Sequence, residues 1–76
     1  MKVFIMTDLE GVSGVDSIDM MDESGNGYRE ACCRLMADTN AAVQGAVDAG
    51  ASEILVYDGH GLGTNFPAGG VDRRAR

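Results

Sequence analysis

The chain has 76 residues and a formal net charge of −6, from 12 acidic and six basic side chains. A chain of this length forms at most one small domain, which buries only about 60% of the surface that the unfolded chain exposes. The negative charge argues against nucleic acid or an anionic membrane surface as a partner, because both require clustered lysine and arginine, and it favours a cation instead.

The first predicted element is a strand over residues 2–8. Its apolar run at residues 3–6 (VFIM) is short and rich in branched or aromatic side chains, which is typical of a buried strand. This run is too short for the hydrophobic region of a signal peptide, and no stretch approaches the ~20 apolar residues of a membrane span. We therefore expect a cytoplasmic protein. The strand leads directly into Asp8-Leu9-Glu10.

Residues 11–25 are rich in glycine, serine and aspartate, which predicts a loop with one short turn near residues 18–21. The loop is acidic, with carboxylates at Asp16, Asp19, Asp22 and Glu23. Their spacing lacks the alternating ligands and central glycine of a calcium loop. A solvated loop is therefore predicted rather than a second cation site.

A long amphipathic helix is predicted over residues 27–49. Ser24, Asn26 and the glycines that flank them are candidate start signals, and Gly50 lies where a left-handed C-terminal cap is expected. The adjacent Cys32 and Cys33 would diverge on a helix, so we expect reduced thiols with a packing role. The apolar positions recur every three or four residues: Cys32, Leu35, Met36, Val43, Ala46 and Val47.

A second strand is predicted over residues 53–58, from the apolar run at residues 54–57 (ILVY), and it ends in Asp58-Gly59-His60. Strand, crossover helix and strand form a right-handed unit with parallel strands in nearly all known cases. The predicted class is therefore α/β, with Asp8 beside Asp58. Because parallel strands normally have helices on both faces, we expect residues 1–76 to be the N-terminal part of a larger three-layer α/β domain.

The two acidic motifs would meet at the carboxyl edge of the sheet, where ligands bind in open α/β folds. Carboxylate and imidazole side chains together suit zinc or another first-row dication. We predict that Asp8, Glu10 and His60 are metal ligands, and that Asp58 orients the imidazole or a bound water. If Asp8 bridges two ions, the site supports hydrolysis. A strand terminus with turn-forming side chains is the simpler alternative.

The chain resembles the zinc-dependent D-aminopeptidases of the DppA type, peptidase family M55. The resemblance rests on residues 7–14 (TDLEGVSG), on the helix segment at 34–42, and on residues 58–61 (DGHG) with Asn65 following. It implies that Asp8, Glu10 and His60 bind two zinc ions, with Asp8 bridging them.

The same resemblance implies a homo-oligomeric ring that removes N-terminal D-amino acids from short peptides. The family's catalytic histidine and remaining ligands have no counterpart in these 76 residues. No catalytic residue is therefore assigned, and we expect the chain to be inactive alone.

Two other functions fit parts of the pattern. A haloacid-dehalogenase-like magnesium phosphatase also ends its first strand in an acidic pair, but Glu10 replaces its second aspartate and His60 has no role there. A noncatalytic metal-binding fragment requires only the three candidate ligands. A dinucleotide-binding module is weaker, since the first turn reads EGVSG rather than GxGxxG.

Overall fold

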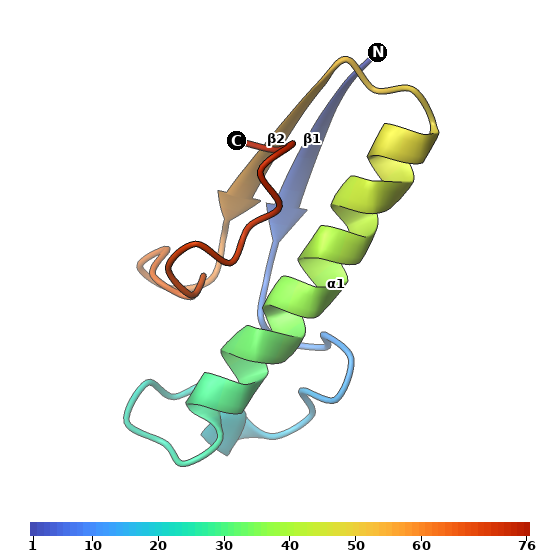
Figure 1. Cartoon of the computed structure of the whole chain (residues 1–76). Coiled ribbons are helices and arrows are strands. Elements are labelled where there is room, and N and C mark those ends of the chain that lie inside the picture. Colours follow the sequence, from blue (N-terminus) through green and yellow to red (C-terminus); the bar gives the residue numbers. More distant parts are fainter.

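The computed structural model describes all residues from 1 to 76. Its elements are strand β1 (Lys2–Thr7), a short 3₁₀ turn η1 (Ile18–Met20), helix α1 (Tyr28–Asp48) and strand β2 (Glu53–Asp58), shown in Figure 1. The predicted elements are all present. β1 ends one residue earlier than predicted, and α1 is one residue shorter at each end. The structure contains no helix with the length and apolarity needed to cross a membrane.

The two strands form a parallel sheet, which confirms the predicted α/β class. Their register runs from Lys2 opposite Glu53 to Thr7 opposite Asp58. The prediction that Asp8 lies beside Asp58 is therefore wrong by one residue. The chain leaves the strand at Asp8, whose Oδ1 accepts a hydrogen bond from the next backbone N–H at 2.8 Å. Because of this local turn, β1 ends at Thr7, one residue before the predicted end.

Helix α1 is ended by a glycine and begins without a side-chain cap. Gly50 has φ +87°, and its N–H donates to the Val47 carbonyl while the following N–H donates to Ala46. This is the Schellman arrangement, so the predicted C-terminal cap is confirmed. Of the predicted start signals, the flanking Gly27 is the N-cap, whereas Ser24 bonds to Asp22 in the loop.

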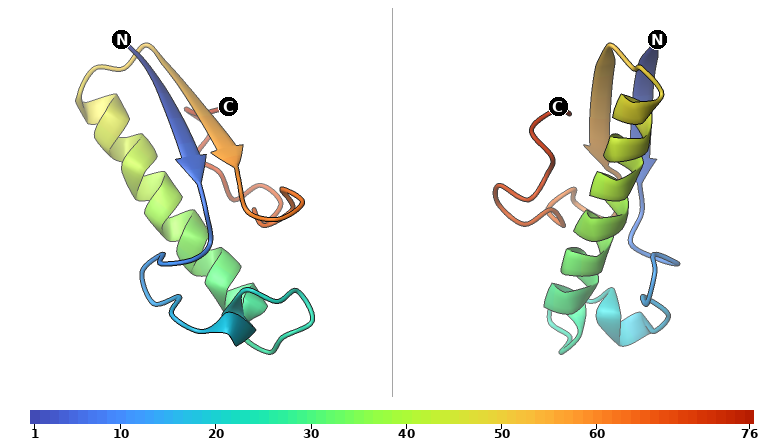
Figure 2. Two further views of the ribbon diagram at one scale, coloured as in Figure 1. Left: turned by 180° about the vertical axis from the view of Figure 1, so that it is seen from behind. Right: turned by 45° about the vertical axis from the view of Figure 1, so that its right-hand side comes forward.

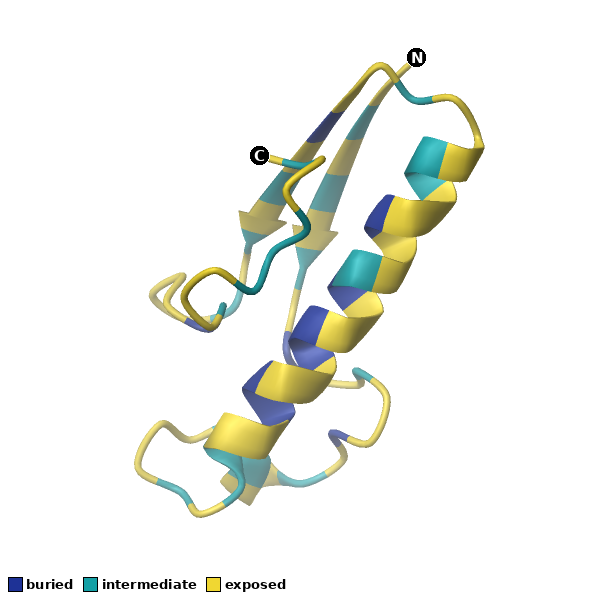
Figure 3. Ribbon diagram, viewed as in Figure 1, coloured by how far each residue is buried: buried dark blue, intermediate teal, exposed yellow.

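One face of α1 packs against the sheet and the loop that follows β1. Figure 3 shows this face as a dark stripe along the helix. Cys32 is buried and Cys33 exposed, and both are free. Burial raises the pKa of the Cys32 thiol, which keeps it protonated and favours the packing role. The buried helix residues are Ala31, Cys32, Leu35, Met36, Thr39 and Val43.

The opposite face of the sheet has no helix over it. Figure 2 shows α1 on one side of the two strands only. Exposure alternates along both strands, and Phe4 and Met6 are 57% and 66% exposed. Phe4 stacks on Tyr57 with ring centroids 6.5 Å apart. The strands were predicted to be buried, but in this chain only the face toward α1 is covered, because a single helix covers a single face.

The segment after Phe66 contains no helix or strand but is fixed to α1. The Asn40 amide donates to the Gly70 carbonyl and accepts from the Asp72 N–H, both at 2.8 Å. Hydrogen bonds from Arg74 lower the pKa of Asp72 to about 2. The segment is therefore tied to the helix by polar contacts rather than by an apolar core.

Replacing Gly45 by alanine is expected to stabilise the fold by about 0.5–1 kcal/mol, because alanine loses less backbone entropy in a helix. Gly45 lies in α1, and an added Cβ would meet nothing within 4 Å. Urea unfolding measures the change. Gly50→Ala is the matched control. Because Gly50 has φ +87°, the same substitution there should destabilise the fold by about 1–2 kcal/mol. Equal signs for the two variants would contradict the prediction.

Candidate metal centre

The first half of the site is the turn that follows β1. Leu9 is completely buried against Val15, Ala31 and Leu35 beneath the N-terminal half of α1. Because the middle residue of Asp8-Leu9-Glu10 points into the core, the acidic residues on either side of it remain exposed to solvent. Burial of one leucine thus presents two carboxylates at the end of the strand.

The second half is the loop after β2, which Gly59 brings against β1. The Gly59 N–H donates to the Thr7 carbonyl at 3.0 Å, one step beyond the last paired residues of the sheet. A Cβ on Gly59 would lie only 2.5 Å from that carbonyl oxygen. Only glycine allows this approach, and the approach places the next residue, His60, beside Asp8.

The three predicted ligands converge. His60 Nδ1 lies 2.9 Å from Asp8 Oδ1, and one ligand atom each from Asp8, Glu10 and His60 lies within 4.8 Å of the others. The His60 side chain is 19% exposed and that of Asp8 61%, so the cluster is open to solvent on one side. The structure therefore brings together all three residues that the sequence singled out.

The spacing of these atoms fits a dication. Bonds of about 2.0–2.2 Å place two ligands of one tetrahedral zinc ion roughly 3.5 Å apart. Around one ion, the atoms that lie up to 4.8 Å apart would have to move closer and the Asp8 and His60 atoms, 2.9 Å apart, would have to move apart. The three residues could instead be shared between two ions about 3.5–4 Å apart. Two carboxylates and one imidazole are also a donor set that zinc accepts.

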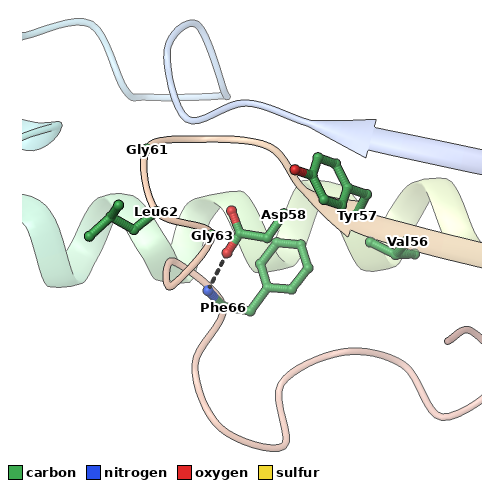
Figure 4. A pocket seen from close by; sticks show the side chains of 7 residues that line it. All are labelled: Val56, Tyr57, Asp58, Gly61, Leu62, Gly63 and Phe66. Atoms are coloured by element: carbon green, nitrogen blue, oxygen red, sulfur yellow. Dashed lines mark hydrogen bonds between the residues drawn. The ribbon is translucent and has the colours of Figure 1, made fainter.

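Asp58, the fourth predicted site residue, has no hydrogen bond to the imidazole. Its carboxylate accepts from the Asn65 N–H at 2.6 Å and from the Phe66 N–H at 3.1 Å, and more weakly from the His60 backbone N–H at 3.5 Å. Figure 4 shows the carboxylate directed at the start of Phe66. Asp58 therefore acts on the backbone of the loop, and the ring of His60 is held by Asp8.

A hollow opens at the end of β2, beside Asp58 (Figure 4). Its wall includes Tyr57, Leu62 and Phe66 but none of the three candidate ligands. Asp58 also lines it, whereas Asp8, Glu10 and His60 lie outside it. The candidate metal ligands thus lie on the exposed carboxyl edge of the sheet, where ligands bind in other open parallel sheets, and not in this hollow.

Asn65 is a site residue to which the sequence assigned no role. It is only 3% exposed, and its side chain contacts Asp58, His60 and Tyr28. Partial burial raises the pKa of the Tyr28 hydroxyl, which therefore stays protonated and donates to the Asn65 amide oxygen. The sequence signal was its place after residues 58–61 in the pattern that carries the family resemblance, because an asparagine two residues before a proline otherwise looks like an ordinary turn.

Comparisons with known proteins agree with this picture. The family model of peptidase M55, described as D-aminopeptidase, matches residues 1–76. A D-aminopeptidase of Bacillus subtilis (strain 168) is 28% identical over 66 residues, which are 87% of this chain and 24% of the relative.

A solved structure has the same fold. The Zn-dependent D-aminopeptidase DppA from Bacillus subtilis, described as a self-compartmentalizing protease, superposes with a TM-score of 0.94 at 25% identity. The match covers 99% of this chain and 27% of that one. The chain therefore spans about a quarter of the length of the relatives it matches.

Proposed function

The chain belongs to the D-aminopeptidase family of peptidase M55 over all its residues, and from this premise we propose that it is the N-terminal portion of a zinc-dependent aminopeptidase domain. The observation that carries the proposal is the convergence of Asp8, Glu10 and His60 at the carboxyl edge of the sheet, with their ligand atoms within 4.8 Å of one another. Asp8 and His60 follow different strands and are 52 positions apart, so the fold and not the local sequence assembles the cluster.

In this proposal Asp8, Glu10 and His60 hold two zinc ions, and Asp8 bridges them. Bound zinc would supply a nucleophile from water at neutral pH and polarise the peptide carbonyl. Asp8 is suited to bridging because its carboxylate has two oxygens that can each bind an ion, and one of them already lies 2.9 Å from His60 Nδ1. Glu10 and His60 would each bind a different ion, and Asp58 would hold the loop that carries His60.

The remainder of the active site would lie in a longer chain. Three ligands are too few to hold two ions and still leave positions for water and substrate. The relatives are about four times as long as this chain, and one face of the sheet is uncovered. We therefore propose that the 76 residues alone have no peptidase activity and that the complete protein is a homo-oligomer acting on short peptides with an N-terminal D-amino acid.

The test uses the complete protein that contains these residues. We expect it to release the N-terminal residue of D-alanyl peptides, to lose activity on exhaustive chelation and to regain it with zinc. The matched control substrate is the same peptide with L-alanine at the N-terminus. Full activity after metal removal would contradict the zinc proposal, and equal rates on both peptides would contradict the proposed stereospecificity.

The magnesium phosphatase considered from the sequence is not favoured. Its mechanism gives no role to a histidine at this position, whereas the His60 ring lies in hydrogen-bond contact with Asp8. The family match over residues 1–76 also points to peptidases. A magnesium-dependent phosphatase activity in the complete protein, with no peptidase activity, would reverse this preference.

A further inference from the structure

Asn65 is a buried residue whose side-chain nitrogen and oxygen both have hydrogen-bond partners. Its side-chain nitrogen donates to Asp58 Oδ1 at 2.8 Å and to the His60 carbonyl at 2.6 Å. Its side-chain oxygen accepts from the Tyr28 hydroxyl, and its backbone N–H donates to Asp58 Oδ2 at 2.6 Å. One amide thus joins the end of β2, the loop that carries His60 and the first turn of α1.

These contacts fix the backbone of His60 from the side opposite to β1. On one side the preceding residue, Gly59, bonds to the Thr7 carbonyl of β1. On the other side the Asn65 amide holds the carbonyl of His60 itself. Because the backbone is held at the Gly59 N–H and at the carbonyl of His60, the imidazole can leave Asp8 only by a side-chain rotation or by breaking one of these bonds. Exposed loops that carry several glycines do not have this restraint by themselves.

We propose that Asn65 is a positioning residue of the metal centre, which keeps the His60 imidazole beside Asp8 by holding the loop between residues 58 and 66. Tyr28 completes the arrangement by fixing the orientation of the Asn65 amide from α1. The inference rests on the proposed function, since it assigns Asn65 a role toward metal that Asp8, Glu10 and His60 would bind.

The chemistry of the site explains why the residue is an amide. Asp58 presents a carboxylate and His60 a carbonyl, so the group between them must donate two hydrogen bonds, while the Tyr28 hydroxyl requires an acceptor. A primary amide offers both. An aspartate at this position would place a second carboxylate against Asp58. Alanine would leave the His60 carbonyl with only the Gly63 N–H at 3.1 Å, and Asp58 Oδ1 with only the long contact to the His60 N–H at 3.5 Å.

The experiment compares four variants of the complete protein: Asn65→Ala, Asn65→Ser, Tyr28→Phe and, as a control, Val43→Ala. Val43 is fully buried in α1 outside the site, so its truncation should lower stability without touching the loop. Zinc affinity is measured by competition with a chromophoric chelator, the ligand geometry by the visible spectrum of the cobalt-substituted protein, and stability by urea unfolding.

We expect Asn65→Ala to weaken zinc binding about 10- to 100-fold, as for residues that orient metal ligands in other proteins, and to alter the cobalt spectrum. Asn65→Ser keeps a hydroxyl donor and should recover part of the affinity. Tyr28→Phe should cost less than Asn65→Ala. Val43→Ala should leave zinc affinity and spectrum at their wild-type values.

Wild-type affinity and spectrum in Asn65→Ala, with only a loss of stability like that of Val43→Ala, would overturn the proposal. If Asn65→Ala does not fold, Asn65→Ser is compared with the wild type instead. Wild-type zinc affinity in Asn65→Ser would then overturn the proposal. A wild-type protein that binds no zinc would instead show that the proposed function is wrong, and the positioning role would fall with it.

Discussion

Asp8→Asn is expected to weaken zinc binding by more than about 100-fold and to remove measurable peptidase activity from the complete protein. Loss of a residue that merely orients a ligand typically costs 10- to 100-fold, so loss of a bridging ligand should cost more. Asparagine keeps an oxygen that can accept from the Leu9 N–H and from the His60 ring, as Asp8 does. The substitution therefore removes the charge while leaving the hydrogen bonds possible.

Two carboxylate variants serve as comparisons for Asp8→Asn, with zinc bound per chain determined by titration. Glu10→Gln should reduce affinity less, because a terminal ligand serves one ion and a bridging ligand two. Asp16→Asn removes an exposed charge in the loop after β1, outside the cluster of candidate ligands, and should have no effect. A larger loss in Glu10→Gln than in Asp8→Asn would contradict the bridging assignment.

Gly59→Ala is expected to lower the zinc affinity at least about tenfold, since it disturbs the loop that orients a ligand. It should also reduce the free energy of unfolding by about 1–3 kcal/mol, the usual cost of forcing atoms into a filled space. The new Cβ would lie 2.5 Å from the Thr7 carbonyl oxygen. That oxygen belongs to the backbone of β1, so it cannot move aside as a flexible side chain would. The loop must shift instead, and His60 shifts away from Asp8.

Gly50→Ala is the control for Gly59→Ala, because it should destabilise by a similar amount at the end of α1 while leaving the site intact. We expect zinc affinity to fall in Gly59→Ala only, as measured by chelator competition on both variants. Equal affinity in both would mean that the loop relaxes without moving His60, and that the close backbone approach is not needed for the metal centre.

The sequence was sufficient to predict the elements, the parallel pairing and the three candidate ligands. Each of these rests on short-range features: two apolar runs, a three- and four-residue apolar spacing along the helix, and Gly50 at its end. The crossover rule then places both strand ends at one edge. Because Asp8 and His60 each follow a strand end within two residues, their convergence follows from topology before any side-chain detail is known.

Tertiary structure alone decided the exact register and the contacts of Asp58 and Asn65. The last pair in the sheet is Thr7 with Asp58. The next residue, Asp8, is already in a turn, where its side chain accepts a hydrogen bond from the Leu9 N–H. Asp58 precedes a glycine and Asn65 lies two residues before a proline, and in sequence such residues look like ordinary turns. Their partners are backbone groups up to eight residues away and the Tyr28 hydroxyl 37 residues away, and such contacts form only once the loop has folded against α1.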